Sequence, residues 1–202
     1  MPPDDGEYFE FAATFRPAGD GAAAYFEQSQ AGVLRNLVSQ VAELVSADST
    51  AAETAAGGHG LEAQLGLSTH AEAPDDPVLA RLLPDGYNDD PEAAAEFRRY
   101  TEESLRSAKV EAAQAVLASL PPAGGDVELA EEDCQQWLRA LNDVRLALSV
   151  RLGITDEDDD LSELLTGDDP RAAFVLAYHW LGELQESLLQ ALTSGGPQGP
   201  LG

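Results

Sequence analysis

Three Asp-Pro pairs divide this chain, and each precedes apolar residues spaced three and four positions apart. The pairs are Asp76-Pro77, Asp90-Pro91 and Asp169-Pro170. An aspartate carboxylate caps the free amides of a first helical turn, and proline fits the first helical position because no hydrogen bond is lost there. The pairs therefore predict a short helix carrying the apolar residues of 78–83, a long helix over about 91–119 and a last helix over about 171–193.

Two more helices are predicted from apolar spacing, one over about 28–46 and one over about 129–152, with Gly153 suited to end the second. Aromatic residues flank the turn composition of 17–21, which predicts a β-hairpin over roughly 8–27. Together these elements predict a mainly α protein. Its expected architecture is a helical bundle of four longer helices plus a short one, with an N-terminal β-hairpin.

A composition break separates the first helix from the others. Residues 47–73 are rich in Ala, Gly, Ser and Thr, and we expect a flexible insert over 47–75. The domain then consists of 1–46, with the hairpin and first helix, and of 76–193, with the remaining helices. The Gly/Pro-rich end of the chain, 194–202, is expected to be a disordered tail.

Charge restricts the partners that this chain can have. Its 37 acidic residues face 11 Lys and Arg, which gives a formal net charge of −26. Such a field repels phosphate and anionic lipid, so we expect no membrane association. It also disfavours direct nucleic-acid binding and favours a basic protein partner. The acidic N-terminus lacks the pattern of a signal peptide, and no stretch has the ~20 apolar residues that span a bilayer. We therefore expect a cytoplasmic protein.

The chain lacks the motifs of common enzyme mechanisms. It has no G-x-S-x-G, no phosphate-binding glycine loop and no H-E-x-x-H. Cys134, its single cysteine, shares a predicted helical face with Trp137 and Leu141, which favours a buried thiol. We expect no catalytic residues, no metal site and no cofactor, and we keep Cys134 as a redox candidate because a single cysteine can still be oxidised.

Two groups of polar residues are candidates for partner contact. Arg98 and Arg99 belong to a cationic stretch within the predicted helix over 91–119. The alternative is structural, because Arg98, Glu102 and Arg106 lie four residues apart and would form exposed ion pairs.

The second group is Asn142, Asp143 and Arg145, in an otherwise apolar helix. It allows either partner contact or a half-buried polar network. Oligomeric state stays open.

Several phrases of the sequence resemble a known family. They are DPVLARLLP at 76–84, DDPE at 89–92, EFRR at 96–99, WLRALNDVRL at 137–146 and WLGELQE at 180–186. In these phrases the chain is similar to the actinobacterial domain-of-unknown-function family that carries the label of oxidative-stress transcriptional regulator (AosR-like). Its members are often encoded beside the ClpS proteolytic adaptor and a metallopeptidase of cysteine biosynthesis.

The resemblance implies a regulator of redox and cysteine metabolism. A cysteine-pair switch within the chain is impossible with Cys134 alone, and direct operator binding fits poorly with the charge. Our leading hypothesis is a non-enzymatic, transcription-associated regulator that contacts a sigma factor or RNA polymerase. One alternative is an adaptor or accessory protein in proteolysis or cysteine assembly. Another is a direct DNA-binding regulator that uses the helix of Arg98 to Lys109.

Overall fold

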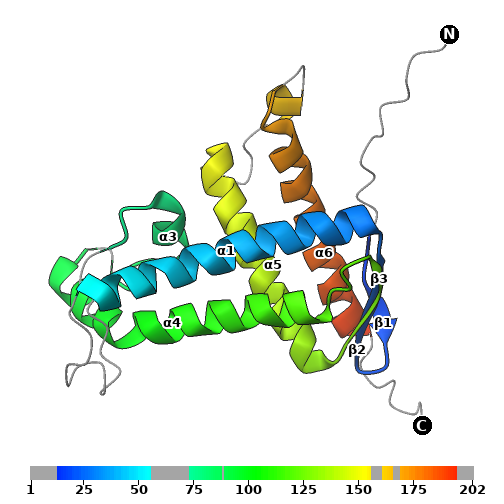
Figure 1. Cartoon of the computed structure of the whole chain (residues 1–202), viewed down its shortest axis with the longest axis horizontal. Helices are drawn as coiled ribbons and strands as arrows, with labels where there is room; N and C mark the ends of the chain where they lie inside the picture. The colour runs from blue at the N-terminus through cyan, green and yellow to red at the C-terminus, as the bar shows by residue number, and fades with distance from the viewer. Residues whose placement is uncertain (1–12, 56–72, 88, 156–160, 166–168, 195–202) are drawn as a thin grey trace.

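Two long antiparallel helices form the base of the fold (Figure 1). They are α1, Gln28–Ala55, and α4, Pro91–Ser119, in a computed structural model that describes residues 13–55, 73–87, 89–155, 161–165 and 169–194. Arg35 of α1 donates through Nη1 to the carbonyl of Leu117, 3.2 Å away, near the C-terminal end of α4. The pairing of opposite ends shows that the two helices run in opposite directions.

The first two Asp-Pro pairs begin helices as predicted. Asp76 Oδ1 accepts hydrogen bonds from the amides of Val78 and Leu79, at 2.7 and 3.1 Å, at the start of α3, Pro77–Leu82. Asp90 caps α4 in the same way, through the amides of Glu92 and Ala93. Both helices therefore start where a carboxylate satisfies free amides.

Two further helices cross the base. Helix α5, Glu131–Leu152, ends at Gly153, whose φ of 72° lies in the left-handed region. Helix α6, Ala172–Ser194, packs against α5, and a short 3-10 helix η1, Ser162–Leu165, lies between them in sequence. The part of the chain that the structure describes thus has five α-helices, and the prediction of a mainly α protein is confirmed. None of the described helices is both long enough and apolar enough to cross a bilayer.

The predicted hairpin is part of a three-stranded antiparallel sheet. Its strands are β1, Arg16–Ala18, β2, Gly21–Phe26, and β3, Gly125–Leu129, in the order β1-β2-β3. The sequence prediction missed β3, because the glycines and prolines after α4 were interpreted as a helix end alone. Its signal is short: Val127 and Leu129 point inward, while Asp126 and Glu128 are exposed.

An aromatic cluster joins the sheet to the helices. The Trp137 ring of α5 lies 5.4 Å from the ring of Phe15 and 5.8 Å from that of Phe26, centroid to centroid. The indole Nε1 of Trp137 donates to Ser119 Oγ at 2.9 Å, so its one polar atom is satisfied. The sheet thereby packs on α5 and α6 rather than standing alone.

Helix α1 is longer than predicted. Its predicted end was Ser46, yet the helix continues to Ala55, because the Ala-rich composition that suggested an insert also has high helix propensity. The remainder of the predicted insert up to residue 72 lies outside the described residues. So do residues 195–202 of the predicted tail, whereas Ser194 ends α6.

Substitution of Gly21 tests how much the pairing of β2 with β3 contributes to stability. A Cβ at this position would lie 1.9 Å from the carbonyl oxygen of Leu129, so Gly21→Ala must push β2 and β3 apart. We expect the free energy of unfolding to fall by about 1–3 kcal/mol. Gly32→Ala is the control: a Cβ there meets no atom within 4 Å, and helix formation gains up to about 1 kcal/mol. Equal unfolding curves for the two variants in urea would contradict the strand pairing.

Candidate functional site

The five predicted contact residues do not form one surface. Arg98 and Asp143 are buried, each with 5% of its surface exposed. Arg99 and Asn142 are exposed, on α4 and α5 respectively, and Arg145 is half-buried. The structure therefore leaves Arg99 and Asn142 as the members available to a partner.

Arg98 belongs to a buried ionic network that is centred on Glu102. Arg98 Nη1 lies 2.8 Å from Glu102 Oε2, and Arg106 Nη2 lies 2.7 Å from Glu102 Oε1. Arg98 also pairs with Asp85, and Arg106 Nη1 donates to the Val45 carbonyl at 2.8 Å. The prediction of exposed ion pairs is wrong here, because the side chains four residues apart face α1 and α3 rather than solvent.

Asp143 is the acidic member of a second ion pair, which joins α5 to α4. Its Oδ1 lies 2.6 Å from Lys109 Nζ. Burial raises the pKa of the Asp143 carboxyl above its ordinary value, although the Lys109 ammonium opposes the shift. This residue supports the half-buried polar network that was the alternative to partner contact.

Arg145 is held between α5 and α6. Its Nη1 donates to Gln185 Oε1 at 2.8 Å, and its guanidinium carbon lies 4.9 Å from the centroid of the Tyr178 ring. Gly182 of α6 lies beside it, and a Cβ there would be 3.6 Å from that carbon, which is ordinary van der Waals contact. The guanidinium thus connects two helices of the fold.

The burial of these cations weakens the case for a DNA-binding helix. Of the four cations in α4, Arg98 and Arg106 are buried in ion pairs and Lys109 is paired with Asp143. The exposed cations of the described residues are scattered over five parts of the fold, namely Arg16, Arg81, Arg99, Arg139, Arg151 and Arg171. Such a distribution lacks the contiguous cationic row that displaces counterions from a duplex.

Glu102 should contribute strongly to stability. Glu102→Gln removes the charge shared by two buried guanidinium groups, and we expect the free energy of unfolding to fall by about 3–5 kcal/mol. The neighbouring Glu103 is exposed, so Glu103→Gln should change it by about 0.5 kcal/mol or less. Urea titrations followed by circular dichroism measure both variants. A similar small effect for both would show that the network is not essential to the fold.

Cys134 is a core residue at the start of α5. Its side chain has 0% exposure, and its Sγ lies 4.0 Å from the Leu129 carbonyl oxygen. Burial raises the thiol pKa above its ordinary value, which lowers the fraction of reactive thiolate. The burial predicted from the helical face is confirmed, and the redox role has no accessible thiol to support it.

The burial of Cys134 can be measured directly. In the native protein we expect an aromatic disulfide reagent to label the thiol at least about a hundredfold more slowly than in urea-unfolded protein, because reaction requires opening of the core. The unfolded protein serves as its own control, since the chain has one cysteine. Rapid stoichiometric labelling of folded protein would overturn this placement and restore the redox candidate.

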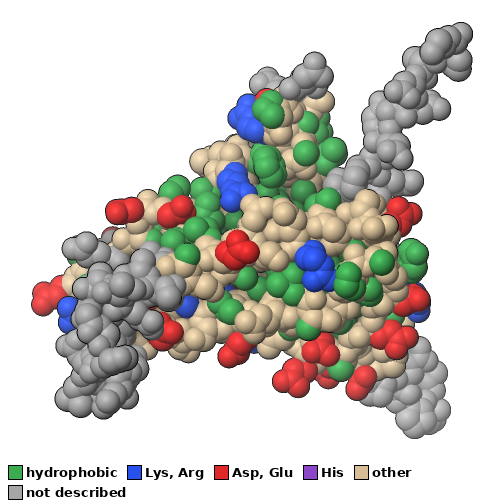
Figure 2. Space-filling view, in the orientation of Figure 1, with side chains coloured by type: hydrophobic (Ala, Val, Ile, Leu, Met, Phe, Trp, Pro, Cys, Tyr) green, Lys and Arg blue, Asp and Glu red, His purple; other side chains and the backbone are tan. Residues whose placement is uncertain are grey.

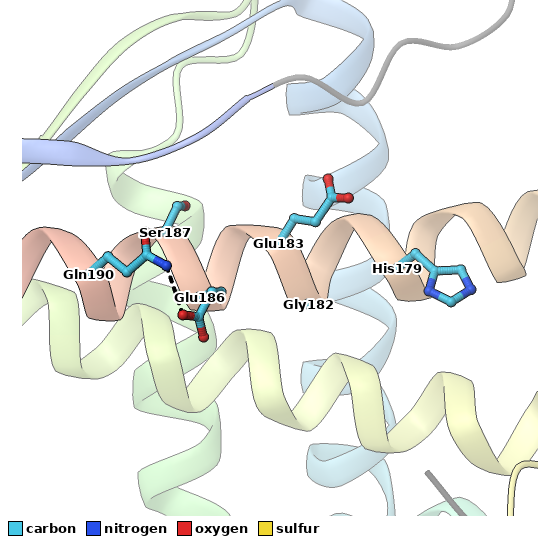
Figure 3. Close-up of a pocket in the computed structure, with 6 residues that line it drawn as sticks. All are labelled: His179, Gly182, Glu183, Glu186, Ser187 and Gln190. Atoms are coloured by element: carbon cyan, nitrogen blue, oxygen red, sulfur yellow. Dashed lines mark hydrogen bonds between the residues drawn. The ribbon is translucent and has the colours of Figure 1, made fainter. Parts of the chain in front are cut away.

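An open depression of about 430 Å³ lies on the outer face of α6 (Figure 3). Its lining residues come from this one helix: His179, Gly182, Glu183, Glu186, Ser187 and Gln190. His179 and Ser187 are two helical turns apart and do not form a nucleophile–base pair. Ser187 Oγ instead accepts a hydrogen bond from the Phe15 amide at 3.0 Å, which fixes the chain before β1.

A larger hollow, of about 530 Å³, lies between the first turns of α1 and of α6, and we name it the α1–α6 groove. It is lined by Ser29, Gly32, Val33, Asn36, Leu37, Ala173, Phe174, Leu176 and Ala177. Phe174 and Leu176 are 37% and 42% exposed, and hydrophobic side chains gather beside α1 where α6 passes it (Figure 2). None of the lining side chains is charged.

Sequence reasoning missed this groove. Phe174 lies within the predicted last helix but was not among the predicted contact residues, and it is partly exposed. Leu176 was the available signal, since it is an apolar residue away from the stripe of Ala177, Leu181 and Leu184. An exposed apolar groove that is rimmed by polar residues is typical of a protein-contact site.

The fold and these surfaces define an acidic, mainly helical protein with a small antiparallel sheet and an uncharged groove. Residues 12–192 match the family described as "Domain of unknown function (DUF2017)", and the chain belongs to this family. The predicted resemblance is therefore confirmed.

Curated relatives come from mycobacteria. The chain is 42% identical over 146 residues to "Oxidative stress regulator AosR" of Mycobacterium tuberculosis and of Mycobacterium bovis, which covers 65% of this chain and 66% of each relative. It is 38% identical over 136 residues to "Putative oxidative stress regulator AosR" of Mycobacterium leprae, covering 61% of each. The chain thus spans less than two thirds of the length of these relatives.

No solved structure matches the chain at a significant level. Within the described residues, no group of three or more His, Cys, Asp or Glu side chains is arranged to hold a metal ion.

Proposed function

We propose that this protein is a cytoplasmic, non-enzymatic regulator of oxidative stress and cysteine metabolism that acts by contact with a protein of the transcription machinery. The names of the mycobacterial relatives support the regulatory part of the proposal. The uncharged α1–α6 groove is the observation that supports action by protein contact. Its partner is a sigma factor or an RNA polymerase subunit.

The groove is suited to an apolar segment with basic flanks. The chain has a net charge of −26, but the residues that line this groove are all uncharged. An apolar segment can therefore bind there without desolvating any ion. Phe174 and Leu176 offer exposed apolar surface there. The surrounding negative field attracts a basic protein and speeds its encounter. Proteins that bind DNA present basic surfaces, which supports a partner from the transcription machinery.

Contact with protein fits the surface better than contact with nucleic acid. A protein partner can supply its own cations, whereas a duplex would need them from this chain. The exposed arginines are scattered over five parts of the fold, and two more cations are buried with Glu102. The non-enzymatic part of the proposal is supported by the absence of a nucleophile–base pair in the two hollows described above.

The experiment is a tagged pull-down from native cytoplasm in moderate salt, with and without nuclease and with and without peroxide. The proposal requires that mass spectrometry identify a sigma factor or polymerase subunit that is retained after nuclease. Retention of protease components or of sulfur-metabolism enzymes would instead favour the adaptor alternative. Recovery that depends on intact nucleic acid would favour direct DNA binding. A peroxide-dependent capture that Cys134→Ala abolishes would restore the redox role of the thiol.

Groove variants make the pull-down specific. We expect the double variant Phe174→Ser, Leu176→Ser to reduce capture of the identified subunit about tenfold or more, because apolar anchors dominate protein interfaces. Leu189→Ser is the matched control, since Leu189 is 46% exposed on the same helix but lies outside the groove. Circular dichroism checks that both variants fold. Equal capture by the two variants would remove the groove from the proposal.

A further inference from the structure

A second exposed cluster lies at the other end of the base, around the first turns of α4. The rings of Tyr87 and Phe97 meet edge to face, with centroids 5.9 Å apart and planes at 88°. Together with Tyr100, Ala93 and Glu96 they line an open pocket of about 250 Å³, which we name the α4 aromatic pocket. Its three rings are 52%, 44% and 63% exposed in the order Tyr87, Phe97, Tyr100.

The pocket is held together by the fold. Gly86 packs against Phe97 so closely that a Cβ on the glycine would lie 2.7 Å from the ring. Arg98, adjacent to Phe97, is bound to Asp85 and to the Leu83 carbonyl, which fixes the loop that carries Tyr87 against α4. The rings therefore lie on two segments whose relative position is set by the buried Arg98 guanidinium, through its ion pair with Asp85 and its hydrogen bond to the Leu83 carbonyl.

Exposed aromatic rings attract cations. The face of a phenol or phenyl ring carries negative electrostatic potential, and several rings around one space recognise ammonium and guanidinium groups. Glu96 adds a carboxylate to the lining, and among the described residues no cation forms an ion pair with it. Rings together with an unpaired carboxylate select a cation over an anion or a neutral ligand.

A volume of about 250 Å³ suits the end of one side chain rather than a large ligand. Arg99 is the exposed cation of α4, while Glu92, Glu96 and Glu103 are exposed acids of the same helix. The excess of acids at this end of α4 favours a cationic ligand. Arginine fits best because its planar guanidinium stacks on rings and binds carboxylates with two nitrogens.

We propose that the α4 aromatic pocket binds an arginine side chain of the basic protein partner. The inference rests on the proposed function, which calls for a basic protein, and it names the residue type that this protein inserts. Tyr87, Phe97 and Tyr100 surround the guanidinium, and Glu96 pairs with it.

The experiment titrates the full-length, isotope-labelled chain with a short blocked peptide of arginine, glycine and serine, followed by amide NMR shifts. We expect saturable shifts at the amides of the pocket residues. Phe97→Leu, Tyr100→Leu and Glu96→Gln should each weaken binding about two- to fivefold. Tyr25→Leu is the control, since Tyr25 is 60% exposed on β2 and far from the pocket in the sequence and the fold.

The outcomes of this titration distinguish failure of the α4 aromatic pocket from failure of the proposed function. Shifts spread evenly over acidic surfaces, or affinities that the three pocket variants leave unchanged, would overturn the pocket while leaving the proposed function intact. Tetramethylammonium chloride separates a small-molecule site from a side-chain site. If it binds in the pocket while the arginine peptide does not, the proposal fails. If the peptide binds nowhere, and the pull-down also retains no basic protein, both the pocket and the proposed function fail.

Discussion

The fold depends on one buried carboxylate, that of Glu102. It lies between the guanidinium groups of Arg98 and Arg106, and those groups extend to the Leu83 and Val45 carbonyls. One side chain of α4 thereby connects this helix to α1 and to the end of α3. Burying three charges costs several kcal/mol in desolvation, which their mutual attraction offsets only while all three are present. The network consequently fixes the position of α4, and with it the position of the α4 aromatic pocket.

The same network determines the chemistry of the surface. With 11 cations against 37 acids, burying cations and acids in pairs removes a larger share of the surface cations than of the surface acids. Arg98 and Arg106 are buried, and Lys109 is committed to Asp143. The helix with the densest cationic sequence therefore presents an acidic face, with Arg99 as its exposed cation. Counting the charges of α4 in the sequence therefore overestimates the cations that this helix could present to a phosphate backbone. It also underestimates how strongly the helix attracts a basic protein.

The helices could be predicted because their signals are local. Aspartate before proline caps a helix whatever lies around it, and apolar spacing marks a face that must be buried. Burial of a polar residue is different: the spacing of Arg98, Glu102 and Arg106 is the same for an exposed row and for a core network. Strand β3 pairs with β2, and the paired residues Ala24 and Val127 are 103 positions apart in the sequence. Only the fold brings them together, so the five residues of β3 carry a weak signal of their own. The groove and the pocket could not be predicted, because each combines two segments that are distant in sequence or separated by a turn.

The α1–α6 groove and the α4 aromatic pocket have complementary roles if one partner contacts both. Helices α1 and α4 are antiparallel, so the α1–α6 groove and the α4 aromatic pocket lie at opposite ends of the pair, on the order of 30 Å apart at 1.5 Å per residue. An apolar segment seated in the groove would raise the effective concentration of a tethered arginine at the pocket. Each contact alone would be weak, and together they would select a partner by the spacing between its apolar segment and its arginine. An acidic surface attracts many basic proteins, so this spacing is what would make recognition specific.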